Sequence, residues 1–113
     1  MDSILQTTKK LLGIDAEYTH FDTDVIVHIN TALFSLRQLG VGPEEGYVVR
    51  DHEDTWTMFV GADSDLEAIK SYIYLRVRLL FDPPNVSHAR DAFDKHRQEL
   101  EWRLQVQREG GLQ

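Results

Sequence analysis

The centre of the predicted fold lies in residues 66–84, which read LEAIKSYIYLRVRLLFDPP. Apolar residues recur there at helical spacing, so we expect a helix that begins at a cap near Asp63 or Ser64 and ends at Phe81. The two prolines after Asp82 stop this helix, because a residue before proline avoids helical backbone angles. Apolar side chains also lie off the main stripe, which predicts a helix buried on most sides or covered by a partner. The predicted central core consists of Leu66, Ile69, Ile73, Val77 and Leu80.

Two helices are predicted before this segment. The first covers residues 2–12, capped by Asp2 or Ser3, and Gly13 supplies its left-handed end. The second covers residues 22–39 and is followed by a glycine. At about 100° per residue, its apolar side chains fall on one broad face. That face consists of Val25, Ile26, Ile29, Ala32, Leu33, Leu36 and Leu39.

One long helix is predicted after the prolines. It begins at Asn85 or Ser87 and reaches about Val106 to Arg108. Its expected inner face consists of Ala89, Phe93, His96, Leu100 and Leu104.

The middle of the chain is less regular. Residues 44–54 are expected to form a polar, acidic loop around a short β-like run, Tyr47-Val48-Val49. Residues 55–60 are expected to form a short helical turn or an extended piece. The sequence therefore predicts a mainly α fold, a compact four-to-five-helix domain with a long acidic loop and at most a short β segment. A length of 113 residues suits one domain, for which we expect residues 1–109, with residues 110–113 as a flexible tail.

The charge of the chain is unevenly distributed. The net charge is −7, but residues 15–67 hold twelve acidic side chains and only two basic ones. Tight binding to DNA phosphates needs clustered Lys and Arg, so this bias disfavours a DNA-binding protein. The chain has no cysteine, no apolar run of the roughly 20 residues that span a bilayer, and no signal-peptide pattern at its start. We therefore expect a soluble protein without a membrane partner.

No residue pattern predicts catalysis or a cofactor. Asp51-His52-Glu53-Asp54 gathers potential metal ligands, but the alternating acids and central glycine of a calcium loop are absent, so a solvated loop is favoured. His88 and His96 lie about 12 Å apart along one helix, too far to share an ion. There is no glycine-flanked serine and no phosphate-binding glycine loop. We expect no enzyme, no metal and no cofactor.

Surplus apolar surface is the most informative feature. Trp102 and Val106 lie off the inner face of the last helix, and Phe34 and Val27 lie off that of the second helix. Apolar groups that one small domain does not cover favour contact with a partner or another copy. These four residues are the candidate interface with another subunit or with a partner protein.

Seven stretches follow one another in a recognisable order: residues 4–15, 18–22, 28–30, 38–43, Thr55-Trp56 with Phe59, 70–84 and 99–104. Through them the chain resembles the head–tail connector (neck adaptor) family of long-tailed phages. The resemblance covers about nine-tenths of the chain, contains no catalytic motif, and is weakest over residues 47–54. It implies that the four candidate interface residues contact a neighbouring subunit or the portal.

The resemblance implies a structural virion protein. It implies a homo-oligomeric ring beneath the portal of the DNA-filled head, with a subunit number that follows the twelvefold portal. That ring would extend the DNA channel and present its far side to the next neck or tail-completion protein. The implied location is the virion neck, after assembly in the host cytoplasm. An acidic channel would let DNA slide without specific binding.

Two alternatives stay open at the level of sequence. One is a regulatory or toxin–antitoxin helical module that binds a single protein partner without forming a ring. The other is a phage accessory protein that binds DNA through Lys70, Arg76 and Arg78.

Overall fold

The computed structural model describes residues 2–110, which form five helices and no strand. The mainly α fold predicted from the sequence is confirmed. The described buried apolar residues belong to one hydrophobic cluster. None of the described helices is long and apolar enough to cross a membrane. The helices are α1 (Ile4–Leu12), α2 (Asp22–Gln38), α3 (Trp56–Val60), α4 (Leu66–Phe81) and α5 (Ser87–Gly110).

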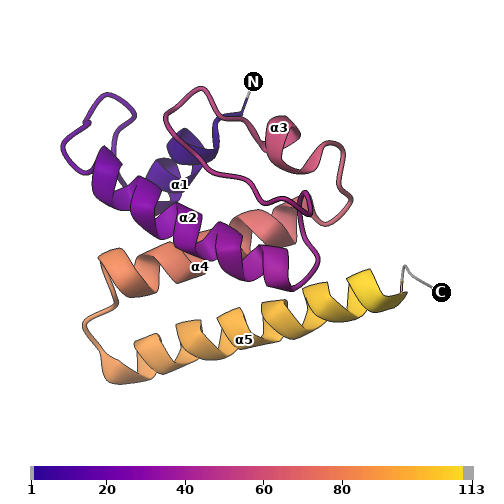
Figure 1. Ribbon diagram of the computed structural model, residues 1–113. Helices are drawn as coiled ribbons and strands as arrows, with labels where there is room; N and C mark the ends of the chain where they lie inside the picture. The colour runs from indigo at the N-terminus through magenta and orange to yellow at the C-terminus, as the bar shows by residue number, and fades with distance from the viewer. Residues whose placement is uncertain (1, 111–113) are drawn as a thin grey trace.

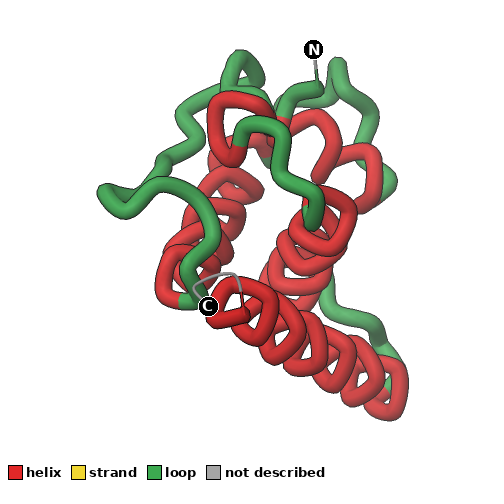
Figure 2. The backbone as a smooth tube through the Cα atoms, turned by 90° about the vertical axis from the view of Figure 1, so that its right-hand side faces the viewer, coloured by secondary structure: helices red, strands yellow, loops and turns green. Residues whose placement is uncertain are grey.

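Helix α4 is the central element of the fold. It packs against α1, α2 and α5, and in Figure 1 α5 lies along the lower edge, with α1, α2 and α3 on the other side of α4. Figure 2, turned by 90°, shows α5 running past the other helices at the base of the molecule. Ile69, Tyr72, Ile73 and Val77 of α4 are fully buried. Burial on several sides explains why α4 is apolar beyond a single stripe.

The predicted core stripe of α4 is wrong at its last member. Leu66 is partly buried, but Leu80 is 52% exposed. Leu80 lies on the same side of the helix as Ile73, but near the end of α4 this side borders a groove between α4 and α5, which is lined by Arg76, Leu79, Leu80, Asp94 and Arg97. The next residue, Phe81, packs edge-on against Phe21, with ring centroids 5.3 Å apart.

Helix α1 ends as predicted, and it carries a buried lysine that the sequence pattern did not predict. Ser3 accepts the N-cap hydrogen bond from the Gln6 amide (3.2 Å), and Gly13 closes the helix with φ of 83°. Lys9 is buried, and its ammonium group pairs with Asp22 at 2.8 Å. It also donates to the carbonyls of Ala16 (3.1 Å) and Tyr18 (2.8 Å). Lys9 therefore fixes the loop between α1 and α2.

The segment before α3 contains no strand within the described chain. Tyr47-Val48-Val49, the expected β-like run, is held instead by a side chain of α2. Asn30 donates to the Val49 carbonyl (3.0 Å) and accepts from the Val49 amide (2.8 Å), as a neighbouring strand would. The only described bridge is an isolated one between Ser3 and Thr55. Thr55 caps α3 by accepting from the Met58 amide at 3.2 Å.

Helix α5 contacts the core along a narrow stripe. Leu100 and Leu104 are buried and Phe93 is partly buried, but His96 is exposed, so its predicted place on the inner face is wrong. His96 lies at the edge of the stripe, beside a groove between α4 and α5. The predicted tail, residues 110–113, lies outside the described residues except for Gly110, which ends α5.

Candidate assembly surfaces

Helix α5 presents an apolar ridge, defined here as Trp102 and Val106. Trp102 is 64% exposed and Val106 is 44% exposed. They stand one turn apart, opposite Leu100 and Leu104, because residues two positions away in a helix are rotated by about 200°. An ion pair between Arg103 and Glu99 (2.9 Å) borders this α5 ridge. A tryptophan surrounded by polar groups is a common anchor of protein interfaces.

A second apolar surface lies on α2 and the loop that follows it. Phe34 is 60% exposed, and Val27, two turns earlier, is 55% exposed. Beside Phe34, the chain forms a groove of about 260 Å³, with Val48 at its edge. We call it the α2 groove, and its lining residues are Asn30, Leu33, Phe34, Arg37, Glu45, Gly46, Tyr47 and Val48.

The wall of the α2 groove is fixed by internal hydrogen bonds. The Tyr47 hydroxyl donates to Asp54 at 2.6 Å, and the same carboxylate accepts from the backbone amide of Arg50 (2.8 Å). Burial, and then this hydrogen bond to a carboxylate, raises the pKa of Tyr47 to about 12. Burial alone would raise the pKa of Asp54, but the hydrogen bonds from Tyr47 and the backbone outweigh it and lower that pKa. The groove is therefore largely preformed.

The acidic side chains of this loop form hydrogen bonds within the loop itself. Asp54 organises the loop backbone, and Asp51 accepts from the Glu53 amide at 2.8 Å. Within residues 2–110, no three His, Asp or Glu side chains are grouped so that they could hold a metal ion. His52 is exposed on this loop, and His88 is exposed on α5.

A polar network joins α5 to α4. The Tyr72 hydroxyl donates to Glu101 at 2.6 Å, and Arg97 donates to the same oxygen at 2.8 Å. Arg97 also pairs with Asp94 at 2.8 Å. Burial, followed by the hydrogen bond to Glu101, raises the pKa of Tyr72 to about 12. The sequence pattern did not reveal this network, because its members are four polar residues on two helices.

The three basic residues considered for DNA binding all have carboxylate partners. Arg76 lies 3.7 Å from Glu101, and Lys70 lies 3.4 Å from Glu67. Arg78 lies against Asp82. These residues are partly buried and do not form a free basic patch, which weighs against the DNA-binding alternative.

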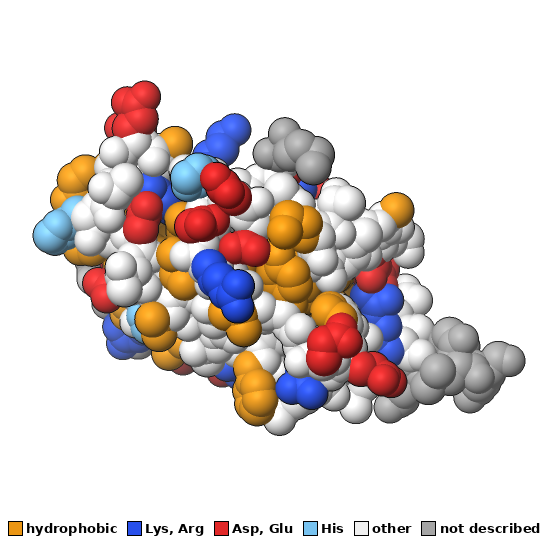
Figure 3. Space-filling view, turned by 45° about the horizontal axis from the view of Figure 1, so that its top comes forward, with side chains coloured by type: hydrophobic (Ala, Val, Ile, Leu, Met, Phe, Trp, Pro, Cys, Tyr) orange, Lys and Arg blue, Asp and Glu red, His pale blue; other side chains and the backbone are white. Residues whose placement is uncertain are grey.

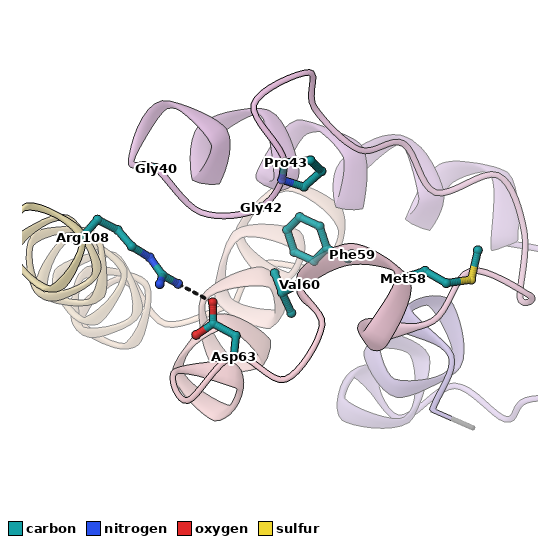
Figure 4. Close-up of a pocket in the computed structure, with 8 residues that line it drawn as sticks. All are labelled: Gly40, Gly42, Pro43, Met58, Phe59, Val60, Asp63 and Arg108. Atoms are coloured by element: carbon teal, nitrogen blue, oxygen red, sulfur yellow. Dashed lines mark hydrogen bonds and ion pairs between the residues drawn. The ribbon is translucent and has the colours of Figure 1, made fainter. Parts of the chain in front are cut away.

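Another cavity lies where the end of α5 meets the turn after α2. Its volume is about 420 Å³, and Figure 4 shows Arg108 reaching across it to Asp63, at 2.7 Å. Gly42 is required there, since its φ is 86° and a Cβ would come within 2.5 Å of the Phe59 ring. The contacts around this cavity attach the end of α5 to the loops after α2 and α3.

Apolar exposure extends beyond the four predicted residues. Figure 3 shows one face of the molecule, where apolar side chains lie in several places among acidic and basic ones. Helical periodicity does not single out these additional residues, since five of them lie near a helix end or in a loop and Met58 lies in the short helix α3. The further large exposed apolar residues are Leu11, Tyr18, Val48, Met58, Leu80 and Val86.

The fold and these surfaces define a small, mainly helical domain with large apolar side chains exposed on two of its helices. The sequence model of one family, described as phage connector protein, matches residues 4–111, and the chain belongs to that family. The resemblance stated from the sequence is thereby confirmed. Searches of curated proteins and of solved structures returned no match. The family is one of structural proteins of the phage neck, which interact with portal or tail proteins in the virion.

Proposed function

We propose that this protein is a subunit of a ring at the phage neck that joins the portal of the DNA-filled head to the tail and extends the DNA channel. The observation that carries the proposal is the exposure of Trp102 and Phe34 on two different helices of a connector-family chain. A chain with two separate contact surfaces can bind a copy on each side, which is the requirement for a ring.

The proposed partners follow from this arrangement. Copies of the chain would bind one another, in a number that follows the twelvefold portal. The ring would bind the portal on one side and a downstream neck or tail-completion protein on the other. It would assemble in the host cytoplasm and remain in the virion neck.

The channel role is supported by charge. Residues 15–67 carry twelve acidic and two basic side chains, and the cations of α4 have carboxylate partners within the chain. Like charges repel, so DNA would pass such a surface without being held. Neither a catalytic role nor a cofactor is part of the proposal.

Reconstitution of head–tail joining tests the proposal. Phage lacking this protein should yield DNA-filled heads and separate tails, and purified protein should restore joining when added to such an extract. Electron microscopy of the restored particles should place the protein between portal and tail. Normal particles formed without the protein would overturn the proposal.

Two measurements distinguish the alternatives. The first is sizing of the purified protein with and without portal protein. A connector should form a complex with the portal, whereas a module that binds one unrelated partner should not. Filter binding at low salt should show no retention of DNA, because the chain is acidic overall and the cations of α4 already have carboxylate partners.

A further inference from the structure

We propose that the α5 ridge of one copy docks into the α2 groove of the next copy, so that the ring closes through one repeated head-to-tail contact. This inference rests on the proposed function, because it requires copies of the chain to meet in a ring. Beyond that function, the inference names the two surfaces that meet between neighbouring copies.

The chemistry of the two surfaces suits a contact between them. The α5 ridge exposes the indole of Trp102, and the α2 groove is a hollow of about 260 Å³. The side chains of Phe34, Tyr47 and Val48 line the groove, so an inserted indole would meet two aromatic rings and an aliphatic group. Aromatic pairs of this kind stabilise contacts beyond the area that they bury.

The position of the helices prevents a chain from filling its own groove. Both α2 and α5 pack on α4, and they do so through the faces that carry Ile29 and Leu104, respectively. The α5 ridge and the exposed side of α2 therefore both point away from α4. A ridge on one face and a groove on another form a heterologous contact, which repeats from copy to copy and gives a ring when the rotation between copies closes the circle.

Charge favours this pairing over a symmetric one. Residues 15–67, which carry the α2 groove, have a net charge of 2 − 12 = −10, and the rest of the chain has 10 − 7 = +3. At the groove, Glu44 and Glu45 lie exposed and Arg37 is a basic lining residue, whereas the ridge face carries the exposed bases Lys95 and Arg103 together with Asp91 and Glu99. A contact between two α2 surfaces would bring two strongly negative regions together, but a ridge of balanced charge can approach this region without that penalty.

Thiol crosslinking tests the pairing directly, because the chain contains no cysteine. Gln105→Cys places a thiol on α5 one turn from Trp102, and Val48→Cys places one at the edge of the α2 groove. Both positions are exposed, so neither substitution should disturb the fold. The two single variants are mixed in equal amounts, assembled into necks with portal, and treated with a short thiol-to-thiol crosslinker.

The expected product is a dimer that contains one copy of each variant. The double variant, with both thiols in one chain, should give a ladder of crosslinked oligomers. Pairing Gln105→Cys with Leu11→Cys, an exposed position on α1, is the matched control and should give no such ladder. Adding Trp102→Ala should weaken the contact about thirtyfold and remove the ladder.

The outcomes separate this inference from the proposed function. Necks that contain the protein but give no crosslink between positions 105 and 48, or that crosslink 105 to 105, overturn the pairing and leave the ring role intact. Absence of the protein from the necks overturns both.

Discussion

Helices α4 and α5 are consecutive in the chain, but they are buried to very different extents. In α4, five residues from Ile69 to Val77 are buried, and they face α1, α2 and α5. In α5, which is longer, Leu100 and Leu104 are the buried apolar residues among those described, and Trp102 between them is exposed. The same residue types therefore serve the fold in one helix and remain available to partners in the other.

The difference shows how a small connector can divide its apolar surface. A central helix covered on several sides stabilises the domain, and a peripheral helix needs only one narrow stripe to dock. The polar network of Tyr72, Arg97 and Glu101 supplies the remaining attachment of α5. Trp102 lies exposed on the opposite face of α5, so we expect it to contribute little to folding.

The largest effect is expected for a truncation in α4. Ile73→Ala should lower the free energy of unfolding by roughly 2–5 kcal/mol, because Ile73 is fully buried and the cavity cannot refill. Denaturant unfolding measures this loss. Leu80→Ala, on the same side of the helix but 52% exposed, is the matched control and should change stability by about 0.5 kcal/mol or less. A loss for Ile73→Ala as small as that expected for Leu80→Ala would show that α4 is not the central helix.

The junction between the two helices should give a pH-dependent effect. The pKa of Tyr72 is raised to about 12, so between pH 10 and 12 the folded chain keeps this proton while the unfolded chain loses it. The contribution of Tyr72 to the free energy of unfolding is therefore fully present below pH 10. It decreases by on the order of 2–3 kcal/mol as the pH rises to 12. Denaturant unfolding curves measured across this pH range check this decrease.

Tyr72→Phe should reduce that alkaline loss. Tyr47→Phe serves as the comparison. The pKa of Tyr47 is also raised to about 12, but its hydroxyl bonds to Asp54 within the loop, so this variant leaves the contact between α4 and α5 unchanged. An unchanged pH dependence in Tyr72→Phe would mean that this hydroxyl does not couple the two helices.

The comparison predicts that Trp102→Ala separates folding from assembly. Because Trp102 is 64% exposed, the melting temperature of the monomer should shift by only a degree or two, in line with a change of about 0.5 kcal/mol. Ring formation or head–tail joining should be lost in the same preparation. Val106→Ala should give a weaker defect of the same kind. A loss of 3–5 kcal/mol in monomer stability would instead identify Trp102 as a core residue.

The smallest expected effect concerns metal ions. The carboxylates of Asp51 and Asp54 already accept hydrogen bonds from the loop backbone. Adding Zn²⁺ or Ca²⁺, or a chelator, should therefore leave the melting temperature unchanged. An ion that binds only the folded state would raise it, so a shift of several degrees would contradict the prediction.

Sequence reasoning located four of the five helices closely, but it was weaker on which of their residues face the core. The helix ends were predictable because Gly13 and the prolines after Asp82 act through local backbone geometry. The errors at Leu80 and His96 arose because periodicity gives the face of a helix but not where a groove opens between it and its neighbour, and both residues line such grooves between α4 and α5. The exposure of Trp102 and Phe34 follows their helical position, and their role in assembly stays a prediction.

The sequence by itself determined the helices, the acidic charge of the first half and the family of the chain, because each depends on residues near one another or on their order. Only the tertiary structure decided that Lys9 is buried against Asp22 and that Asn30 holds Val49 in place. It also decided that Val48 and Phe34 share one groove. These contacts join residues that are up to 19 positions apart, and their geometry is set by how the helices pack and not by any local pattern.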